Sequence, residues 1–252
     1  MTTRSQLQDI MNSVRNNTVI EPRLFDALLS ATVYAHIPVT QVPGRIRFVQ
    51  FDRPDNGMTV LPFFSDLEKA ERALGASREI CVMAMDARQL FELTRGATLM
   101  LDPNDSWAVL YPEEIAALLA GESLVAFELE TVPAPETVGV RAPTVPVDNL
   151  IKLLEAYCQS EASVVAGYIV EILRGEDHQE ASLLVALAAP ADVKERVVRA
   201  SMQFAQPAID GLALPLLMTA IEPDGESASF YNRGTQFYGQ CGLAKRAEGM
   251  PD

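Results

Sequence analysis

The stretch LMLDPNDSWAVLYPEEI, residues 99–115, suits two different structures at first sight: a calcium-binding loop between helices, or a turn between strands. Counted from Asp102, oxygen-bearing side chains stand at positions 1, 3, 5 and 12, which is most of the spacing of an EF-hand. These side chains belong to Asp102, Asn104, Ser106 and Glu113. The remaining residues of the stretch decide between the two structures.

An EF-hand requires glycine at position 6, where the loop turns sharply. Trp107, the only tryptophan of the chain, occupies that position, and Pro103 stiffens position 2. The preceding residues 97–101, ATLML, are mostly β-branched or aliphatic and favour a strand over a helix. The stretch therefore predicts a strand, a turn, a second strand and a helix that begins at Pro112, without a calcium site.

Outward from this stretch, the first half of the chain alternates predicted strands and helices. Further strands are expected at residues 31–39, 45–51, 58–64 and 79–85, and further helices at residues 65–74 and 86–94. Ser65 is expected to cap the helix at 65–74, because Glu68 follows it at the spacing of a capping box. The Asn-Gly pair at 56–57 predicts a hairpin turn between the second and third of these strands.

The second half of the chain follows a different order of elements. Residues 131–147 contain four prolines and no sustained period, which predicts an extended linker between two domains, 1–130 and 148–252. A helix, two strands, a helix and a strand are then expected at residues 147–160, 163–173, 180–189, 190–206 and 212–221. The fold class predicted is α+β, with an α/β-type N-terminal domain built on a mixed sheet and a smaller α-β-β-α-β C-terminal domain.

Composition narrows the possible partners. The net charge is −14, and it is spread evenly, with 11 basic and 18 acidic residues up to residue 130 and 9 and 16 beyond it. A field of that sign repels nucleic acids and anionic lipid surfaces, so neither is expected as a partner. The N-terminal residues have no secretory signal and no apolar run is long enough to cross a bilayer, so a cytoplasmic location is expected.

No pattern in the sequence predicts catalysis. A nucleophile motif of the GxSxG type, a phosphate-binding loop and a dinucleotide fingerprint are absent, and the three cysteines and two histidines have no metal-site spacing. His36 is expected in the core or at a strand edge, Cys81 as a buried and inert thiol, and Glu113 and Glu114 on a solvated helix face. We therefore predict no enzyme activity, no catalytic residue, no cofactor and no metal.

The C-terminal segment SFYNRGTQFYGQCG, residues 229–242, gathers aromatic residues around an arginine. Two readings of this segment stay open: it folds back to cover an open sheet face, or it forms a surface that binds a protein partner. The residues predicted to bind a partner are Phe230, Tyr231, Arg233, Phe237 and Tyr238.

In this order, the pieces resemble the SseB family, the enhanced-serine-sensitivity proteins of bacteria, over about residues 20–240. The segment LPFFSDLEKAERAL at 61–74 is similar to the family's strand and helix start, and residues 99–119 to its Leu-Asn-Pro-Gly turn, strand and helix. The later match rests on residues 150–172 and on TQFYGQ at 235–240, where Gln236 replaces a proline. The motif residues that the resemblance assigns to structure are Phe64, Ser65, Asp102, Pro103, Asn104 and Trp107.

Two of these motif residues depart from the family pattern, since Asp102 stands where the family usually has asparagine and Asn104 where it often has glycine. The family name comes from a phenotype and supplies no catalytic residues. The resemblance thus implies a non-enzymatic accessory or regulatory protein that acts by binding a protein partner. The alternatives are an amino-acid sensor with a small-molecule pocket between the domains, and a chaperone associated with a secretion system.

Overall fold

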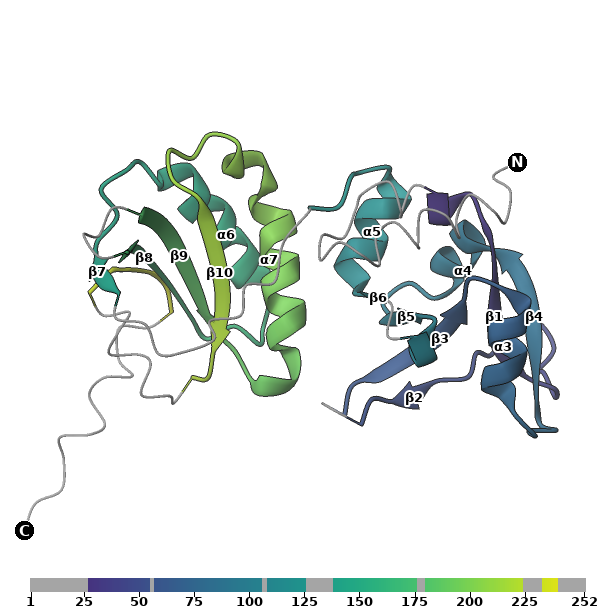
Figure 1. The fold of residues 1–252 in the computed structure, drawn as a ribbon. Helices are drawn as coiled ribbons and strands as arrows, with labels where there is room; N and C mark the ends of the chain where they lie inside the picture. The colour runs from purple at the N-terminus through teal and green to yellow at the C-terminus, as the bar shows by residue number, and fades with distance from the viewer. Residues whose placement is uncertain are drawn as a thin grey trace, which may run out of the picture. The chain divides into compact units, whose positions relative to one another are not determined.

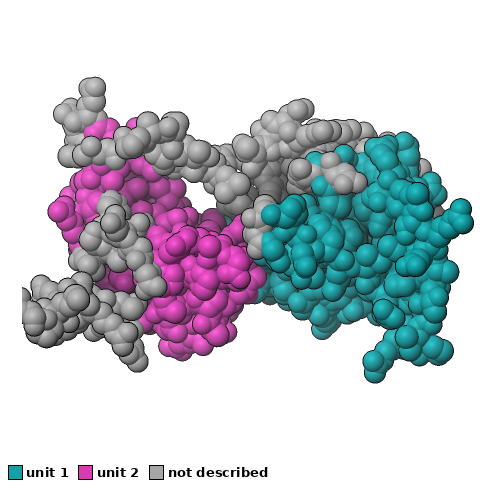
Figure 2. Space-filling model, turned by 90° about the horizontal axis from the view of Figure 1, so that it is seen from below, with its two compact units in different colours: residues 1–131 teal, residues 132–252 magenta. Residues whose placement is uncertain are grey.

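The structure is a computed structural model, and it describes residues 27–54, 57–105, 108–125, 138–175, 180–223 and 233–239. The chain divides into two compact units, residues 1–131 and 132–252 (Figure 1, Figure 2). Each unit is built on its own sheet and is described by itself. The fold class is α+β, as predicted.

Unit 1 contains a mixed sheet with the strand order β4-β1-β3-β5-β6, and β2 pairs with β3. Its strands are β1 (Thr32–Pro38), β2 (Phe51–Asp52), β3 (Thr59–Phe64), β4 (Ile80–Asp86), β5 (Leu99–Leu101) and β6 (Ala108–Leu110). Its helices are α3 (Leu67–Leu74), α4 (Ala87–Leu93) and α5 (Pro112–Ala120), and a 3-10 turn, η1, spans Pro103–Asp105. Strands β3 and β5 run parallel, whereas the other pairs are antiparallel.

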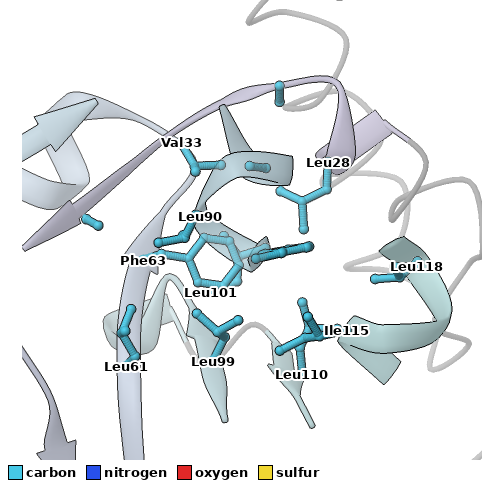
Figure 3. Close-up of a cluster of buried hydrophobic side chains, with 14 of the residues drawn as sticks. Leu28, Val33, Leu61, Phe63, Leu90, Leu99, Leu101, Leu110, Ile115 and Leu118 are labelled. Carbon is cyan, nitrogen blue, oxygen red and sulfur yellow. The ribbon is translucent and has the colours of Figure 1, made fainter. Parts of the chain in front are cut away.

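The core of unit 1 follows from the alternation of side chains along its strands. Leu61 and Phe63 of β3 point into one cluster, where Phe63 meets Phe91 of α4 edge to face at 5.9 Å. Figure 3 shows Phe63 in the middle of this cluster, with Leu61 beside Leu99 of β5 and Ile115 of α5 beside Leu110 of β6. Burying side chains of this size stabilises a fold by about 1.5–3 kcal/mol each. Helices α4 and α5 therefore cover this face of the sheet.

The opposite face of the same strands is covered by α3. His36 and Phe64 point to that side with their rings 4.8 Å apart, and His36 Nε2 donates to the carbonyl of Ala70 in α3 at 2.9 Å. His36 is thus a buried core residue, one of the two settings expected for it, and the structure adds its backbone partner.

Local sequence signals set several of these elements. Helix α5 begins at Pro112 and ends before Gly121, whose φ of 81° is left-handed, so both expected boundaries are confirmed. The 45–64 hairpin is present but short, because only Phe51 and Asp52 of its first strand pair with β3. The order β5, η1, β6, α5 confirms the predicted strand, turn, strand and helix. It differs from an EF-hand, in which the loop lies between two helices.

One expectation about a helix start needs correction. The side chain of Asp66, not of Ser65, caps α3 by accepting from the backbone N–H of Lys69 at 2.9 Å. Asp86 is the N-cap residue of α4, although its side chain makes no capping hydrogen bond.

Unit 2 contains the predicted α-β-β-α-β order and two further strands. Its elements are β7 (Gly139–Arg141), α6 (Asp148–Ser160), β8 (Ala166–Arg174), β9 (Glu180–Ala188), η2 (Ala191–Val193), α7 (Lys194–Ile209), β10 (Leu216–Ile221) and β11 (Thr235–Tyr238). The strand order is β10-β9-β8-β11, with β7 also on β8, and β10 runs parallel to β9. Helices α6 and α7 lie on one face of this sheet (Figure 1), over a core that includes Leu154 and Val185.

The predicted linker lies partly outside the described residues, namely at 131–137. Its later part is structured, because Gly139–Arg141 form β7 and pair with β8. The described end of that segment therefore belongs to the sheet of unit 2.

Candidate functional site

Strand β11 belongs to the aromatic C-terminal segment, of which the structure describes residues 233–239. It pairs antiparallel with β8, with Thr235 opposite Ile169, and the register shifts between Gln236 and Tyr238. Strand β7 pairs further along the same edge of β8, so the two short strands continue each other along that edge. Among the described residues, no strand pairs with the outer side of β11.

The shift in register explains why neighbouring residues of β11 both turn inward. Phe237 and Tyr238 are half-buried and pack against the core beneath α6 and α7. In a regular strand, two successive side chains point to opposite faces. The irregularity places both aromatic rings at the helical face of unit 2.

Two glycines permit the close approach of β11 to β8. A Cβ atom on Gly167 of β8 would lie 2.6 Å from the ring of Phe237. Gly239, directly after β11, has a φ of 97°, and a Cβ there would lie 2.5 Å from the carbonyl oxygen of Val165. Only glycine fits both positions without movement of a neighbour, so the docking of β11 is built into the sequence.

A hollow of about 320 Å³ lies where β11 meets α6. The residues that line this β11 hollow are Glu155, Gln159, Gln236, Phe237, Tyr238 and Gly239. Glu155 and Gln159 lie four residues apart on α6 and so share one side of that helix. The hollow combines two aromatic side chains with one carboxylate and two amides.

The predicted partner-binding residues are only partly brought together. Phe237 and Tyr238 line the β11 hollow and Arg233 is exposed just before β11, whereas Phe230 and Tyr231 lie outside the described residues. Sequence reasoning missed Glu155 and Gln159, because their i, i+4 spacing on α6 says nothing about which strand lies beside them.

The motif residues of unit 1 form a second polar site, the Asp102 cluster, consisting of Ser65, Lys69, Asp102 and Asp105. Asp102 is 1% exposed and has a φ of 46°. Its carboxylate accepts from the backbone N–H of Ser65 at 2.9 Å and from the Ser65 hydroxyl at 2.7 Å. Lys69 Nζ lies 2.7 Å from Asp102 and 3.0 Å from Asp105.

The parallel strands explain why these groups meet. Ser65 follows β3 and Asp102 follows β5, so both stand at the carboxyl ends of adjacent parallel strands. That edge of a parallel sheet often holds ligands in α/β proteins. Here the carboxylate of Asp102 already accepts three hydrogen bonds, and all three donors belong to this chain.

The Asp102 cluster has a serine beside a lysine, yet its electrostatics do not suit a nucleophile. Burial by itself lowers the pKa of Lys69, but the hydrogen bonds and charges of Asp102 and Asp105 outweigh it, so the pKa is raised. A lysine activates a neighbouring serine only in the neutral form, which can accept a proton. Lys69 stays an ammonium ion and supports the turn at residues 102–105.

The remaining motif residues are placed as follows. Phe64 is buried beside His36, and Pro103 opens the 3-10 turn η1. The side chain of Asn104, and Trp107 as a whole, lie outside what the structure describes.

A buried glutamate in unit 2 forms a further polar group of contacts. Glu171 of β8 is 1% exposed and accepts from Arg141 Nε at 3.0 Å and from the backbone N–H and hydroxyl of Thr144. Burial by itself raises the pKa of Glu171, but the hydrogen bonds from Thr144 and Arg141 outweigh it and lower the pKa. This contact ties the segment after β7 to β8.

Cys158 and a glutamate at the start of α5 lie in surroundings that do not favour reactivity. Burial raises the pKa of the Cys158 thiol to about 12, which disfavours the reactive thiolate. Cys81 is half-buried, less enclosed than expected. Glu114 is 4% exposed, which corrects the expectation of a solvated face, because its carboxylate accepts from the backbone N–H of Tyr111 at the start of α5.

The described residues offer neither a cluster of metal ligands nor a membrane-spanning helix. Within that part of the chain, no group of three or more histidine, cysteine, aspartate or glutamate side chains is placed to hold a metal ion. No helix there combines the length and the apolar character that crossing a bilayer requires.

Comparison with known proteins identifies related sequences. Residues 7–117 match the family model described as SseB protein N-terminal domain. The chain is 26% identical to Protein SseB of Escherichia coli (strain K12) over 216 residues. This alignment covers 83% of this chain and 81% of the relative. Protein SseB of Shigella flexneri gives the same values. No solved structure gives a significant match.

Proposed function

The chain belongs to the SseB family, and we propose that it is a non-enzymatic accessory or regulatory protein that binds a protein partner at the β11 hollow of unit 2. The observation that carries this proposal is the position of β11, a docked strand at the edge of a sheet with a hollow beside it. Edge strands can pair with an extended segment of another chain through backbone hydrogen bonds.

The lining of the β11 hollow suggests the chemistry of the partner. Phe237 and Tyr238 offer aromatic surface, which is enriched among residues that dominate binding energy. Glu155 places a carboxylate at the same hollow, in a half of the chain with net charge −7. A partner segment with an apolar side chain and a neighbouring basic side chain fits this lining best, and the charges would speed its association.

The proposal that the protein is not an enzyme is supported by the state of its polar groups. Lys69 is held as an ammonium ion and Cys158 as a thiol. The carboxylate of Asp102 is occupied by donors of the same chain.

A photo-crosslinking experiment tests the binding site. A photoreactive amino acid replaces Gln236, which is exposed on β11 and lines the hollow, in the full chain within its native host. We expect one specific crosslinked partner, and we expect Gln159→Lys to abolish the adduct. Asn149→Lys is the matched control, because it makes the same change of charge at an exposed position on another side of α6.

The outcomes separate the possibilities. An absence of any adduct from position 236, or equal loss of the adduct in Asn149→Lys and Gln159→Lys, would contradict binding at the hollow. Mass spectrometry of the adduct identifies the partner. A secretion-system substrate as that partner would support the chaperone alternative, and a cytoplasmic protein the regulatory one.

Amino-acid sensing is the second candidate, because the β11 hollow is large enough to hold an amino acid. About 320 Å³ is near the lower end of small-molecule sites, which begin at about 300 Å³. A ligand at 100 times its dissociation constant adds about 2.7 kcal/mol to stability, so the amino acid that binds should raise the melting temperature. A thermal-shift screen in which no amino acid moves the melting temperature would remove this candidate.

A further inference from the structure

Exposed apolar side chains concentrate in one loop of unit 1, residues 39–47, between β1 and β2. Val39, Val42 and Ile46 are 57%, 47% and 42% exposed. The other large apolar side chains exposed in the described residues lie singly on separate elements: Leu67, Leu93, Val165 and Phe204. Single exposed apolar residues are ordinary, whereas a group of them marks an interaction surface.

Hydrogen bonds fix the shape of the 39–47 loop. The amide of Gln41 donates to the carbonyl of Pro38 at 2.7 Å and accepts from the backbone N–H of Arg47 at 2.9 Å. Within the loop, the N–H of Arg45 donates to the carbonyl of Val42 at 3.1 Å. A loop held in one conformation loses less entropy on binding than a flexible one.

Positive charge surrounds these apolar side chains. Arg45 and Arg47 are exposed in the loop itself, and Arg78 is exposed on the neighbouring connection, where Val39 N–H donates to the carbonyl of Glu79 at 2.8 Å. The three arginines and Glu79 give a local charge of +2 in a chain of −14. None of the three arginines forms an ion pair with another described residue.

We propose that the 39–47 loop is a docking surface for an acidic segment of a partner protein, whose apolar side chains pack on Val42 and Ile46 while its carboxylates face Arg45 and Arg47. Charge complementarity selects this occupant. Nucleic acids and anionic membranes also carry negative charge, but the net charge of −14 repels such extended polyanions, whereas a short acidic segment meets only the local field. This surface is distinct from the β11 hollow, which fits a basic segment.

Binding of three short fluorescent peptides to the full chain tests the proposal. The peptides share the same leucine and phenylalanine positions, and their other positions are all glutamate, all serine or all lysine. We expect saturable binding of the glutamate peptide that weakens with salt, and about tenfold weaker binding of the serine peptide. The lysine peptide, which suits the β11 hollow, should cause no change at the 39–47 loop. Amide chemical shifts should change at residues 39–47 and 78–79 when the glutamate peptide is added.

Paired variants separate specific docking from general attraction. We expect Arg45→Glu/Arg47→Glu, and separately Val42→Ser/Ile46→Ser, each to weaken binding of the glutamate peptide by about tenfold or more. Arg88→Glu/Arg95→Glu is the matched control, because it changes the charge equally at exposed positions elsewhere in unit 1. Glu155→Lys, which tests the β11 hollow, should leave this binding intact.

Several outcomes would overturn the proposal. These are no binding of the glutamate peptide, equal weakening by the control variant, shift changes only outside the loop, and binding of anionic vesicles without binding of the peptide. Dimerisation of the free chain that the loop variants abolish would assign the surface to a second copy and would equally overturn it.

Discussion

Asp102 has a left-handed backbone conformation and a buried carboxylate that forms an ion pair. Its φ of 46° lies in the left-handed region, where asparagine and aspartate are tolerated better than other side chains. Its buried carboxylate also holds the charge of Lys69, which the amide of an asparagine would not neutralise. Aspartate at this position therefore meets the backbone requirement of the turn and adds an ion pair.

Substitution of Asp102 separates these two properties. We expect Asp102→Ala to lower the free energy of unfolding by about 2–4 kcal/mol, because it leaves the donors of Ser65 and Lys69 without their buried acceptor. Asp102→Asn should cost roughly half as much, since the turn and part of the hydrogen bonding remain. Urea denaturation of both variants measures the difference. Stability of Asp102→Asn equal to that of the unchanged chain would show that the charge of Asp102 has no role.

Glu171 makes stability depend on pH in the acid range. Its pKa is lowered in the fold, so the folded protein binds this proton less readily than the unfolded chain. The stabilisation is complete above the ordinary pKa of about 4.5 and is lost as the pH falls through the lower, folded value. In acid titrations followed by circular dichroism, Glu171→Gln should be less stable at neutral pH and lose less stability on acidification. An unchanged acid limb in this variant would contradict the assignment.

The sequence predicted the role of single residues only where the cause is local. Pro112 and Gly121 delimit α5 as expected, because their backbone preferences act within one turn. Ser65 matched a capping box by spacing, yet its hydroxyl donates to Asp102, 37 residues away. Partners at that distance depend on which strands become neighbours, and spacing along the chain carries no such information.

Short strands were harder to predict than helices for a related reason. Strands β7 and β11 have three and four residues, and both are stabilised by pairing with β8 rather than by their own composition. For this reason the proline-rich segment that contains β7 was predicted to be a linker. The aromatic segment that contains β11 left two alternatives open, covering a sheet face or binding a partner. The structure adds an edge strand, whose aromatic side chains nevertheless reach the helical core.

The docking of β11 depends on Gly239. A side chain there would meet the carbonyl of Val165 and would also strain a left-handed backbone, at a cost of about 1–3 kcal/mol. We expect Gly239→Ala to speed hydrogen exchange of the amides of Thr235–Tyr238 by roughly tenfold or more, while β8 and β9 exchange as before.

The matched control for this variant is Gly211→Ala, because the nearest atom to a Cβ there is 3.7 Å away and the backbone needs no left-handed conformation. Its exchange at β11 should equal that of the unchanged chain. Unchanged exchange in Gly239→Ala as well would show that the close approach of β11 is not required for its docking.

At the scale of the molecule, each unit has a core of its own. The cluster around Leu90 joins strands and helices of unit 1 only, and the cluster around Leu154 joins those of unit 2 only. Both leucines are fully buried. We therefore expect the two units to unfold in separate steps. The order of elements in the sequence suggested two domains, but it does not show whether their cores are separate.

Two core variants test this separation. Leu90→Ala and Leu154→Ala should each remove about 2–5 kcal/mol from the unit that contains it. Hydrogen exchange of backbone amides follows the two units separately, through β1 in unit 1 and β8 in unit 2. We expect Leu90→Ala to speed exchange in β1 while β8 exchanges as before, and Leu154→Ala to do the reverse. Equal acceleration of both strands in each variant would mean that the two cores unfold as one cooperative structure.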